Sequence, residues 1–550
     1  MAAVGRKALV LLASQVVGSV MGYGAILVIG RYFPPAAYGA WAVAFAAGSL
    51  LVILMNLGFG EAFVHFVARG ADTGRALGVF LRLRLALTAL TVLLVLAAAW
   101  LYTGPLGGEL TDATTWPVFW LALATMVLSV VRQMPLDLWL GRQQVHRTEA
   151  IKTLDTALNL VLLAALGVAL AAQEGRWTPV GPLAPALADL LGVTRPWSVP
   201  EIAIGLALCT LAAKAATLLP TLAWWSRDRV PPGPWDRKLA RQHWDYARPI
   251  ALAGAVAIAL GATDIIMLGF FHTTADTGLY GMAQRVSGLA LLAATAVGTI
   301  LLPFFSQVLG GGRHAEAARA LGLAERYLLI LTLPVAAAFV ALPGPVLHVA
   351  VGDQYLDAAV PLAILGGLAV VFAASVPLRL KLMGGGFPKE TLRASILNTV
   401  LNALLNLWFI PDAPGLGLKG AGAALGTLLS TLVTYVYLRL RVRRHFGVPF
   451  WNGRLAHITL AGAGLAALWA LAHQSLGASA FAHAWQLVAW GGAGTLLFLG
   501  WLVLLGELRG PDLRYFASLV SPGGLWRELS GRGGTPPEGD DDPPMPPQGT

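Results

Sequence analysis

The sequence predicts an all-α membrane protein that crosses the bilayer many times, and three observations support this fold class. Of the 550 residues, 57% are hydrophobic and only 12% are charged, so the mean hydropathy is +0.69. A soluble chain carries about 25% charged residues. Apolar runs of about 20 residues, long enough to cross roughly 30 Å of hydrocarbon, recur along the chain. These runs show no strand-like alternation, which favours helices over a closed barrel.

About fourteen such runs can be placed, and each is predicted to be a transmembrane helix. Their approximate limits are 8–30, 40–66, 79–102, 116–140, 150–172, 201–225, 247–271, 279–304, 323–344, 359–380, 392–410, 420–439, 455–474 and 484–507. The first run is too long for the core of a signal peptide and leads directly into the second, so we expect it to be retained. The composition excludes a set of soluble domains and a disordered chain, and a single cysteine, Cys209, excludes a disulfide scaffold.

The positions of the basic residues predict how these helices are oriented. If the N-terminus is cytoplasmic, 31 of the 38 lysines and arginines fall on the cytoplasmic side, four fall on the opposite side, and Arg132, Lys214 and Arg285 fall inside spans. This asymmetry favours an even number of spans with both termini in the cytoplasm. We therefore expect a multi-pass protein of the cell (inner or plasma) membrane. The formal charge of +10 then reflects topology rather than a nucleic-acid partner.

Part of the sequence is repeated after 239 residues. Without a gap, this offset aligns Ile26–Gly30 with Ile265–Gly269, and it also aligns Gly39 with Gly278. Six predicted spans separate the two copies, so both have the same orientation and would be related by an axis along the membrane normal. Chance similarity between two apolar hairpins is the alternative explanation. Because the glycines and both loop lengths agree, we favour a real repeat.

This repeat predicts a division of the chain into four parts. We expect an N-terminal six-helix lobe at 1–230, a C-terminal six-helix lobe at 231–445, two further helices at 446–508, and a cytoplasmic tail at 509–550. The tail holds repeated prolines and the acidic run Asp540–Asp542. Its last twenty residues have little to bury, so we predict that the tail is largely disordered.

Several motifs resemble those of the polysaccharide (O-antigen type) flippases, a family of the multidrug/oligosaccharidyl-lipid/polysaccharide exporter superfamily. The first two motifs are similar to the family's opening hairpin, and the later ones to its seventh, eighth, eleventh and twelfth spans. In order they are Arg31–Gly39 (RYFPPAAYG), Asn56–Gly60 (NLGFG), Thr263–Gly269 (TDIIMLG), Gly278–Arg285 (GLYGMAQR), the asparagines Asn398, Asn402 and Asn406, and Gly417–Ala424 (GLKGAGAA). The similarity extends over most of residues 5–440, and it depends on the order and spacing of the motifs together.

The resemblance implies a function and a set of partners. Members of this family move a polyprenyl-(pyro)phosphate-linked oligosaccharide from the cytoplasmic to the outer leaflet, and many have a cationic cavity between two six-helix lobes. The implied partners are this glycolipid, membrane lipids, and candidate glycosyltransferases, a polymerase or a ligase of the same pathway. Asn56 stands where the family usually has an aspartate, so the resemblance does not carry an acidic role to this position.

Ionisable residues inside the spans are candidate site residues, because a charge near the bilayer centre costs about 2.5–3.5 kcal/mol on insertion scales. Lys214 lies at the middle of its predicted span and is the strongest candidate for a cavity cation. Asp264 and Arg285 are expected at similar depth in neighbouring spans, since each residue of a helix rises about 1.5 Å. These two residues could pair, either to bind cargo or an ion, or only to fasten the two helices together.

Other polar residues lie nearer the cytoplasmic ends of the spans. They could bind phosphate or carry a proton, or they could simply reach the interface. Glu61 and His65 are four residues apart and share a helix face. The predicted substrate-binding residues are Lys214, Arg285, Arg132, Gln284 and Gln133, and the predicted ion-coupling or structural residues are Asp264, Glu61 and His65.

The sequence lacks the motifs of several enzyme classes. It contains no cysteine–histidine set with metal spacing and no phosphate-binding G-x-x-x-x-G-K-[ST] loop. We therefore predict a transporter without catalytic residues, cofactor or metal. A multidrug or small-molecule exporter of the same superfamily is the alternative. A membrane glycosyltransferase or a polysaccharide ligase is less favoured, because it would need acidic residues or a large domain in an outward loop.

Overall fold

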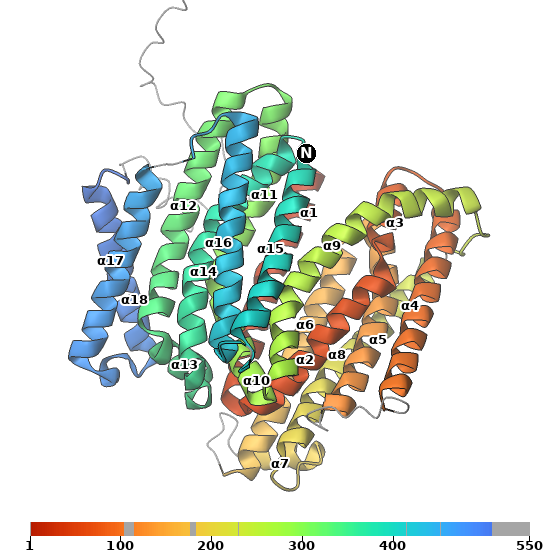
Figure 1. Ribbon diagram of the computed structural model, residues 1–550. Helices are drawn as coiled ribbons and strands as arrows, with labels where there is room; N and C mark the ends of the chain where they lie inside the picture. The colour runs from red at the N-terminus through yellow and green to blue at the C-terminus, as the bar shows by residue number, and fades with distance from the viewer. Residues whose placement is uncertain are drawn as a thin grey trace, which may run out of the picture.

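The computed structural model describes residues 2–103, 115–175, 183–228, 230–413, 415–450 and 453–508, and these residues form a helical bundle without a strand (Figure 1). The α-helices are α1 (Ala2–Tyr32), α2 (Pro35–Asn56), α3 (Phe59–Ala68), α4 (Thr73–Thr103), α5 (Thr115–Gly141), α6 (Val145–Gln173), α7 (Leu183–Leu190), α8 (Val199–Arg227), α9 (Arg237–Phe271), α10 (Thr274–Ser287), α11 (Leu292–Gly310), α12 (His314–Ala341), α13 (Pro343–Val351), α14 (Ala359–Gly384), α15 (Pro388–Phe409), α16 (Lys419–Phe446), α17 (Gly453–Leu476) and α18 (Ala484–Leu504). Three short 3₁₀ helices accompany them, η1 (Gly288–Leu291), η2 (Asp353–Ala358) and η3 (Ala478–Phe481).

The predicted class, an all-α polytopic membrane protein, is confirmed. Within the described residues, 11 helices are long and apolar enough to cross a membrane. The three other predicted spans correspond to α1, to α15, and to the segment in which α10, η1 and α11 follow one another. The count of fourteen spans stays a prediction, and the predicted tail at 509–550 lies outside the described residues.

One predicted span is divided in the structure. The apolar run at 40–66 forms two helices, because α2 ends at Asn56 and α3 begins at Phe59. Between them, Leu57 and Gly58 both have positive φ angles, of 41° and 74°. Gly58 also packs against α9, where an added Cβ would lie 2.7 Å from the carbonyl oxygen of Ala247. Apolar periodicity did not reveal this break, since both sides of it are hydrophobic.

Local sequence signals explain where other helices begin. Ser198 and Glu201 form a capping box at the start of α8, in which the backbone N–H of Ser198 donates to Glu201 Oε2 at 2.7 Å. At the start of α9, Asp236 Oδ1 accepts from the backbone N–H groups of Lys238 and Leu239, at 2.9 and 3.0 Å. These oxygens satisfy N–H groups that the first turn of a helix leaves without partners.

The first turns of α2 and α10 pack against each other through a reciprocal pair of glycines. A Cβ added to Gly39 would lie 1.7 Å from the carbonyl oxygen of Thr274, and a Cβ added to Gly278 would lie 1.9 Å from that of Pro35. The repeat offset of 239 residues relates Gly39 to Gly278 and also Pro35 to Thr274. Each repeat therefore places the same carbonyl against the other's glycine, as a two-fold axis between them requires. We call this contact the glycine seam.

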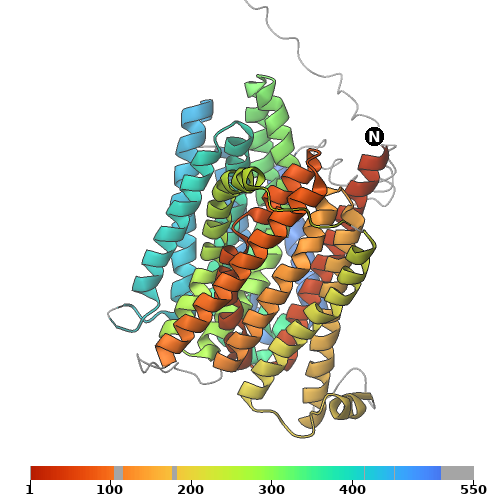
Figure 2. The same ribbon diagram turned by 90° about the vertical axis from the view of Figure 1, so that its right-hand side faces the viewer.

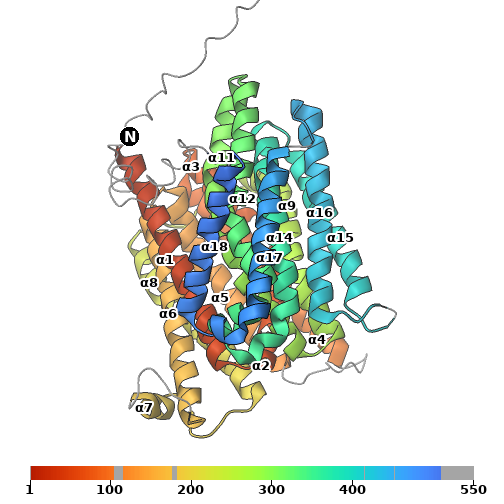
Figure 3. The ribbon, with the colours of Figure 1, turned by 90° about the vertical axis from the view of Figure 1, so that its left-hand side faces the viewer.

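A second set of contacts closes the same end of the bundle. The end of α1 docks against α13 and η2, where Arg31 Nη2 donates to the carbonyl oxygen of Val349 at 2.7 Å. The hydroxyl of Tyr355 donates to the carbonyl oxygen of Phe33 at 3.1 Å. The N-terminus lies at the opposite end, while α7 lies at the same end as these contacts (Figures 2 and 3). At the α7 end, segments far apart in the sequence are thus held together through backbone atoms.

Helix α9 contacts helices from both halves of the chain. Near its start, Trp244 packs against Phe59 of α3 with ring centroids 5.9 Å apart. Further along, the carbonyl oxygen of Val256 accepts from Thr399 Oγ1 of α15 at 3.3 Å. The predicted division at 230/231 stays a prediction, and α9 contacts helices on both sides of it.

The last two helices pack on the outside of α12 (Figure 3). Trp469 of α17 and Phe498 of α18 are 2% and 1% exposed and share a buried cluster with Leu333 of α12. Two glycines allow this close approach, because a Cβ at Gly462 would lie 2.6 Å from Leu333 and one at Gly494 would lie 2.3 Å from Trp469. Helices α17 and α18 therefore extend the C-terminal half without contributing to the glycine seam.

We predict that larger side chains at the glycine seam separate the α7 end of the bundle. In a Cys209→Ser background, spin labels at the exposed positions Leu190 and Asp412 report the separation of the two halves. The double variant Gly39→Val with Gly278→Val should lengthen this distance by several ångströms, because each new side chain collides with a backbone carbonyl. Double electron–electron resonance measures the distance between the two spin labels directly.

The control for this experiment is Gly254→Val in α9, where an added Cβ meets nothing within 4 Å. It inserts the same side chain into a helix and should leave the label distance unchanged. An unchanged distance in the seam variant as well would contradict a closed contact at these glycines.

Candidate functional site

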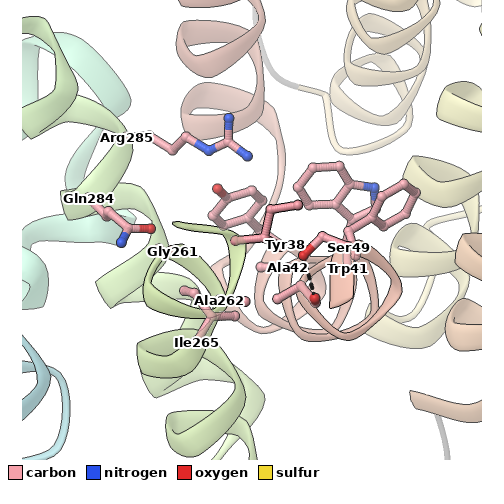
Figure 4. Close-up of a pocket in the computed structure, with 13 residues that line it drawn as sticks. Tyr38, Trp41, Ala42, Ser49, Gly261, Ala262, Ile265, Gln284 and Arg285 are labelled. Atoms are coloured by element: carbon pink, nitrogen blue, oxygen red, sulfur yellow. Dashed lines mark hydrogen bonds between the residues drawn. The ribbon is translucent and has the colours of Figure 1, made fainter. Parts of the chain in front are cut away.

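A polar pocket of about 330 Å³ lies next to the glycine seam, between α2, α9 and α10 (Figure 4). Its polar groups are the Arg285 guanidinium, the Gln284 amide, the Tyr38 and Ser49 hydroxyls and the Trp41 indole. The lining residues are Tyr38, Trp41, Ala42, Phe45, Ala46, Ser49, Ile258, Gly261, Ala262, Ile265, Gly281, Gln284 and Arg285. Because Tyr38 directly precedes Gly39, the seam lies at one end of this pocket.

One wall of the pocket is an aromatic stripe along α2. Tyr38 stacks on Trp41 with centroids 5.7 Å apart, and Trp41 stacks on Phe45 at 4.6 Å. Across the pocket, Arg285 and Gln284 project from α10 (Figure 4). The indole Nε1 of Trp41 is buried and has no hydrogen-bond partner in the structure. A buried donor without a partner is rare in folded proteins, so this N–H is available to an oxygen of a bound molecule.

Arg285 supplies the positive charge of this pocket. Among the described residues no carboxylate forms an ion pair with it. The expected pair of Asp264 with Arg285 is therefore not formed, although the two residues do lie in neighbouring helices. The cation faces the pocket, and the carboxylate lies in a separate polar network behind the pocket wall.

Asp264 is buried, with 1% exposure, and accepts hydrogen bonds from four side chains of three other helices. Asn402 and Asn406 of α15 donate to Oδ1 at 3.1 and 2.7 Å. Thr427 of α16 lies 2.7 Å from Oδ2, and the hydroxyl of Tyr280 of α10 also donates to Oδ2. Neutral donors thus take the place of a cation as partners of this carboxylate.

The Asp264 network adjoins the polar pocket through shared helices. Ile265 follows Asp264 on α9 and lines the pocket, and Gly281 follows Tyr280 on α10 and lines it too. A shift of α10 that follows a change at Asp264 would therefore also move Arg285. The oxygens of Asn406 and Asn398 are buried without partners, so the network retains unused acceptors.

The predicted cavity cations Lys214 and Arg132 lie elsewhere, inside the N-terminal half. Both contact Asp155 of α6: Lys214 Nζ pairs with its Oδ2, and Arg132 Nη2 lies 3.4 Å from the same atom. The three side chains are 21%, 8% and 13% exposed. They do not line the polar pocket described above. In this arrangement one partly buried carboxylate compensates two cations.

Gln133, Glu61 and His65 form separate contacts of their own. Gln133 Nε2 donates to Asp137 Oδ1 at 2.8 Å, and this carboxylate also pairs with Arg84 at 2.6 Å. Glu61 accepts from Asn56 at 3.4 Å. His65 stacks on Tyr246 of α9, with centroids 4.2 Å apart, and shares a hydrogen bond with its hydroxyl at 3.1 Å. Glu61 and His65 share a helix face, but each contacts a different residue.

The sequence did contain a signal for the missed residue Asp155. It is an acidic residue within the predicted span 150–172, and the cost of a charge inside the membrane applies to it as it does to Asp264. Thr427, Tyr38 and Trp41 gave no such signal, because threonines and aromatic residues are common in membrane helices. No group of three or more histidine, cysteine, aspartate or glutamate side chains that could hold a metal occurs in the described part of the chain.

The fold is that of the MOP-superfamily transporters. The lipid II flippase MurJ, in an inward closed conformation, is 12% identical and superposes with a TM-score of 0.63, over 90% of this chain and 97% of that chain. An inward-facing multidrug resistance transporter of the MATE family is 17% identical, with a TM-score of 0.58 over 78% and 95% of the two chains. No protein of curated function matches the sequence significantly.

Residues 4–309 match the family model of the polysaccharide biosynthesis proteins, and this match covers more than half of the chain. The chain therefore belongs to the polysaccharide biosynthesis protein family, as its motifs indicated. It is a multi-pass membrane protein with a transporter fold.

We predict that Asp155 and Lys214 differ in their importance for stability. Asp155→Asn leaves the buried Arg132 and the partly buried Lys214 without a counterion and should lower the free energy of unfolding by about 3 kcal/mol. Lys214→Met leaves the Arg132–Asp155 pair intact and should lower it by roughly 1 kcal/mol or less. Denaturant unfolding of the purified protein in detergent measures both values.

The exposed Asp189 of α7 provides the matched control, since Asp189→Asn removes the same charge at the surface. It should change the unfolding free energy by less than about 0.5 kcal/mol. Equal losses for Asp155→Asn and Lys214→Met would contradict the view that Asp155 compensates both cations.

Proposed function

We propose that the protein flips a polyprenyl-(pyro)phosphate-linked oligosaccharide from the cytoplasmic to the outer leaflet, for the assembly of a cell-surface glycan. The observation that carries the proposal is a polar pocket with one unpaired cation, placed where the two repeats meet at the glycine seam. Membership of the polysaccharide biosynthesis family and the transporter fold support the same function.

The pocket suits the head of such a lipid for a physical reason. A phosphate that leaves water loses strong hydration, and a guanidinium that faces the pocket replaces that hydration with charge-assisted hydrogen bonds. Arg285 can do so because no carboxylate of the described residues neutralises it. The aromatic stripe of Tyr38, Trp41 and Phe45 offers apolar faces for the C–H surfaces of sugars, while Trp41 Nε1 and Gln284 offer hydrogen bonds to hydroxyl groups.

The glycine seam gives the pocket one closed end. With both termini in the cytoplasm, as the distribution of basic residues predicts, the seam lies toward the outer face and the pocket is closed to that side. Two lobes at 1–230 and 231–445, which separate at this contact and close again, would alternately expose the pocket to the two faces. A head bound by a single arginine is held weakly enough to be released when the seam opens.

Asp264 is our candidate for the group that couples an ion to this motion. Protonation, or binding of a monovalent cation by the carboxylate and the amide and hydroxyl oxygens around it, would neutralise the charge and rearrange its four donors. Since Tyr280 belongs to α10, such a rearrangement would be transmitted to Arg285, five residues further along the same helix. Lys214 and Arg132 then contribute to the positive potential and stability of the N-terminal lobe rather than to direct contact with the head in this state.

We predict that Arg285 is required for flipping. In proteoliposomes that contain a fluorescent lipid-linked oligosaccharide, Arg285→Gln should slow the change of leaflet by roughly tenfold or more, since a hydrogen bond to a charged group contributes about 1.5–3 kcal/mol. Arg285→Lys should retain part of the rate, because it keeps the charge and loses the fork of donors. A leaflet-specific quencher measures the rate.

Lys389→Gln, which removes an exposed charge at the start of α15, is the control for the Arg285 variants and should flip the lipid normally. A normal rate for Arg285→Gln would contradict the assignment of this residue. If the unmodified protein moves no such lipid but does transport small amphiphilic drugs, the exporter is the correct function and the flippase proposal fails.

We also predict that Asp264→Asn separates binding from coupling. The amide has the shape of the carboxylate but does not titrate, so the protein should fold and still bind the glycolipid. Its flipping rate should no longer respond to an imposed proton or sodium gradient, whereas the unmodified protein should respond to one of them. The same quencher assay, run with each gradient in turn, measures the response, and an unchanged response in the variant would exclude Asp264 as the coupling group.

A further inference from the structure

Helix α9 (Arg237–Phe271) is longer than a membrane crossing requires. Its 35 residues amount to about 52 Å at a rise of 1.5 Å per residue, whereas the hydrocarbon is roughly 30 Å thick. Between Arg248 and Asp264 the sequence holds no lysine, arginine, aspartate or glutamate. The part of α9 that crosses the bilayer therefore begins near Arg248, and residues 237–248 precede it.

This first segment of α9, residues 237–248, runs across the end of the bundle instead of standing upright. Figure 1 shows it passing obliquely over the N-terminal half, and Figure 2 shows it nearly end-on beside the upright helices. Its entry is fixed to the start of α4, where the backbone N–H of Gly233 donates to the carbonyl oxygen of Gly74 at 2.7 Å. With this end of the bundle in the cytoplasm, as the basic residues predict, the segment would lie in the plane of the cytoplasmic headgroups.

One face of this segment packs against α3. His243 and Ala247 are both 0% exposed. The ring centroid of His243 lies 4.6 Å from that of Phe66, and the ring of Tyr246 stacks on that of His65. These contacts fix the rotation of the segment about its own axis, so the residues on its other side are held at the surface of the protein.

The other face carries a basic stripe. Its members are exposed and follow one another at intervals of four, three and four residues, which places them on one side of a helix. They are Arg237, Arg241, Trp244 and Arg248. Two acidic residues lie nearby: Asp236 accepts from the first N–H groups of α9, and Asp245 pairs with Arg248 at 3.4 Å. Since Lys238 is exposed as well, positive charge is in excess on this surface.

Two tryptophans distinguish a membrane surface from a soluble acidic partner. Trp244 is 44% exposed within the stripe, and Trp235, just before α9, is 47% exposed. Tryptophan is enriched at the level of the lipid headgroups, where its ring meets both apolar carbons and water. Arginines at the same level reach lipid phosphates, which they bind through paired N–H donors. A helix that lies in the membrane plane with both residue types on one face suits an anionic leaflet.

We propose that the basic stripe binds the headgroups of anionic phospholipids, such as phosphatidylglycerol, in the cytoplasmic leaflet. The surface is independent of the proposed flippase activity, since it shares no residue with the polar pocket. Bound lipids hold the start of α9 at the membrane surface. Further along the same helix, Ile265 lines the pocket and Asp264 forms the centre of the polar network, so the stripe anchors the element that carries both.

The test measures which lipid lies next to this segment. In the Cys209→Ser background, Gln242→Cys places one thiol at an exposed position of the segment, outside the stripe, and a fluorophore is attached to it. The full-length protein is reconstituted in vesicles with phosphatidylglycerol or phosphatidylcholine that carries a nitroxide quencher. Quenching should show a preference for phosphatidylglycerol of roughly fivefold or more, since one basic residue near the surface contributes about 1 kcal/mol.

Two pairs of substitutions separate charge from shape. Arg237→Gln with Arg241→Gln should bring the preference close to equality, because both cations are lost from an exposed surface. Arg237→Lys with Arg241→Lys should retain most of the preference, because both charges remain. The matched control is Arg443→Gln with Arg444→Gln, which removes two exposed arginines from the end of α16 and should leave the preference at this label unchanged.

Three results would overturn the proposal. The first is equal quenching by the two lipids in the labelled protein, or a preference that Arg237→Gln/Arg241→Gln leaves unchanged. The second is an equal loss in the Arg443→Gln/Arg444→Gln control, which would show that only the net charge of the protein matters. The third is a preference that appears only after deletion of residues 509–550, which would show that the acidic tail covers the stripe.

Discussion

An ionised side chain is tolerated within hydrocarbon only when other groups compensate its lost hydration, and this constraint organises the whole molecule. Asp155 compensates two cations in the N-terminal half, and Glu325 and Arg439 pair at 3.1 Å in the C-terminal half. Asp264 is compensated differently, by four neutral donors from three helices. Arg285 differs again, because its charge is directed into a pocket. The charges of these helices thus divide into those that stabilise the bundle and those whose partners we propose to change during transport.

The glycine seam connects this charge distribution to the proposed motion. Direct backbone contact between the first turns of α2 and α10 lets the two repeats approach more closely than any side chain would permit. The pocket begins at Tyr38, which directly precedes the seam residue Gly39. The Asp264 network lies behind the pocket wall that α9 and α10 form. A helix that belongs to the seam, the pocket and the network at once can transmit a change at any one of them to the other two. This shared use of α10 is the structural basis for coupling in our account.

Much of the fold, and only part of the site, could be predicted from the sequence. Apolar length predicted the helical membrane class, and the 239-residue offset aligned Gly39 with Gly278, which the structure places in contact. Arg285 and Gln284 line one pocket, whereas Lys214 and Arg132 contact Asp155, and substrate binding by any of the four stays a prediction. Depth along a helix can be counted from the sequence, but the face that a residue presents depends on the packing of neighbouring helices. For the same reason the pairing of Asp264 with Arg285, which the sequence left open, is not formed among the described residues, and Thr427 could not be identified.

The central claim is that one pocket between the repeats is accessible from one face of the membrane at a time. It is tested by Ser49→Cys in a Cys209→Ser background, which places a single thiol in the pocket. A membrane-impermeant maleimide is applied to the cytoplasmic or the outer face of oriented vesicles. The account predicts labelling from the cytoplasmic face alone at rest, and labelling from the outer face once the Gly39→Val/Gly278→Val substitutions open the seam. Labelling from both faces at rest, or from the outer face alone, would contradict it.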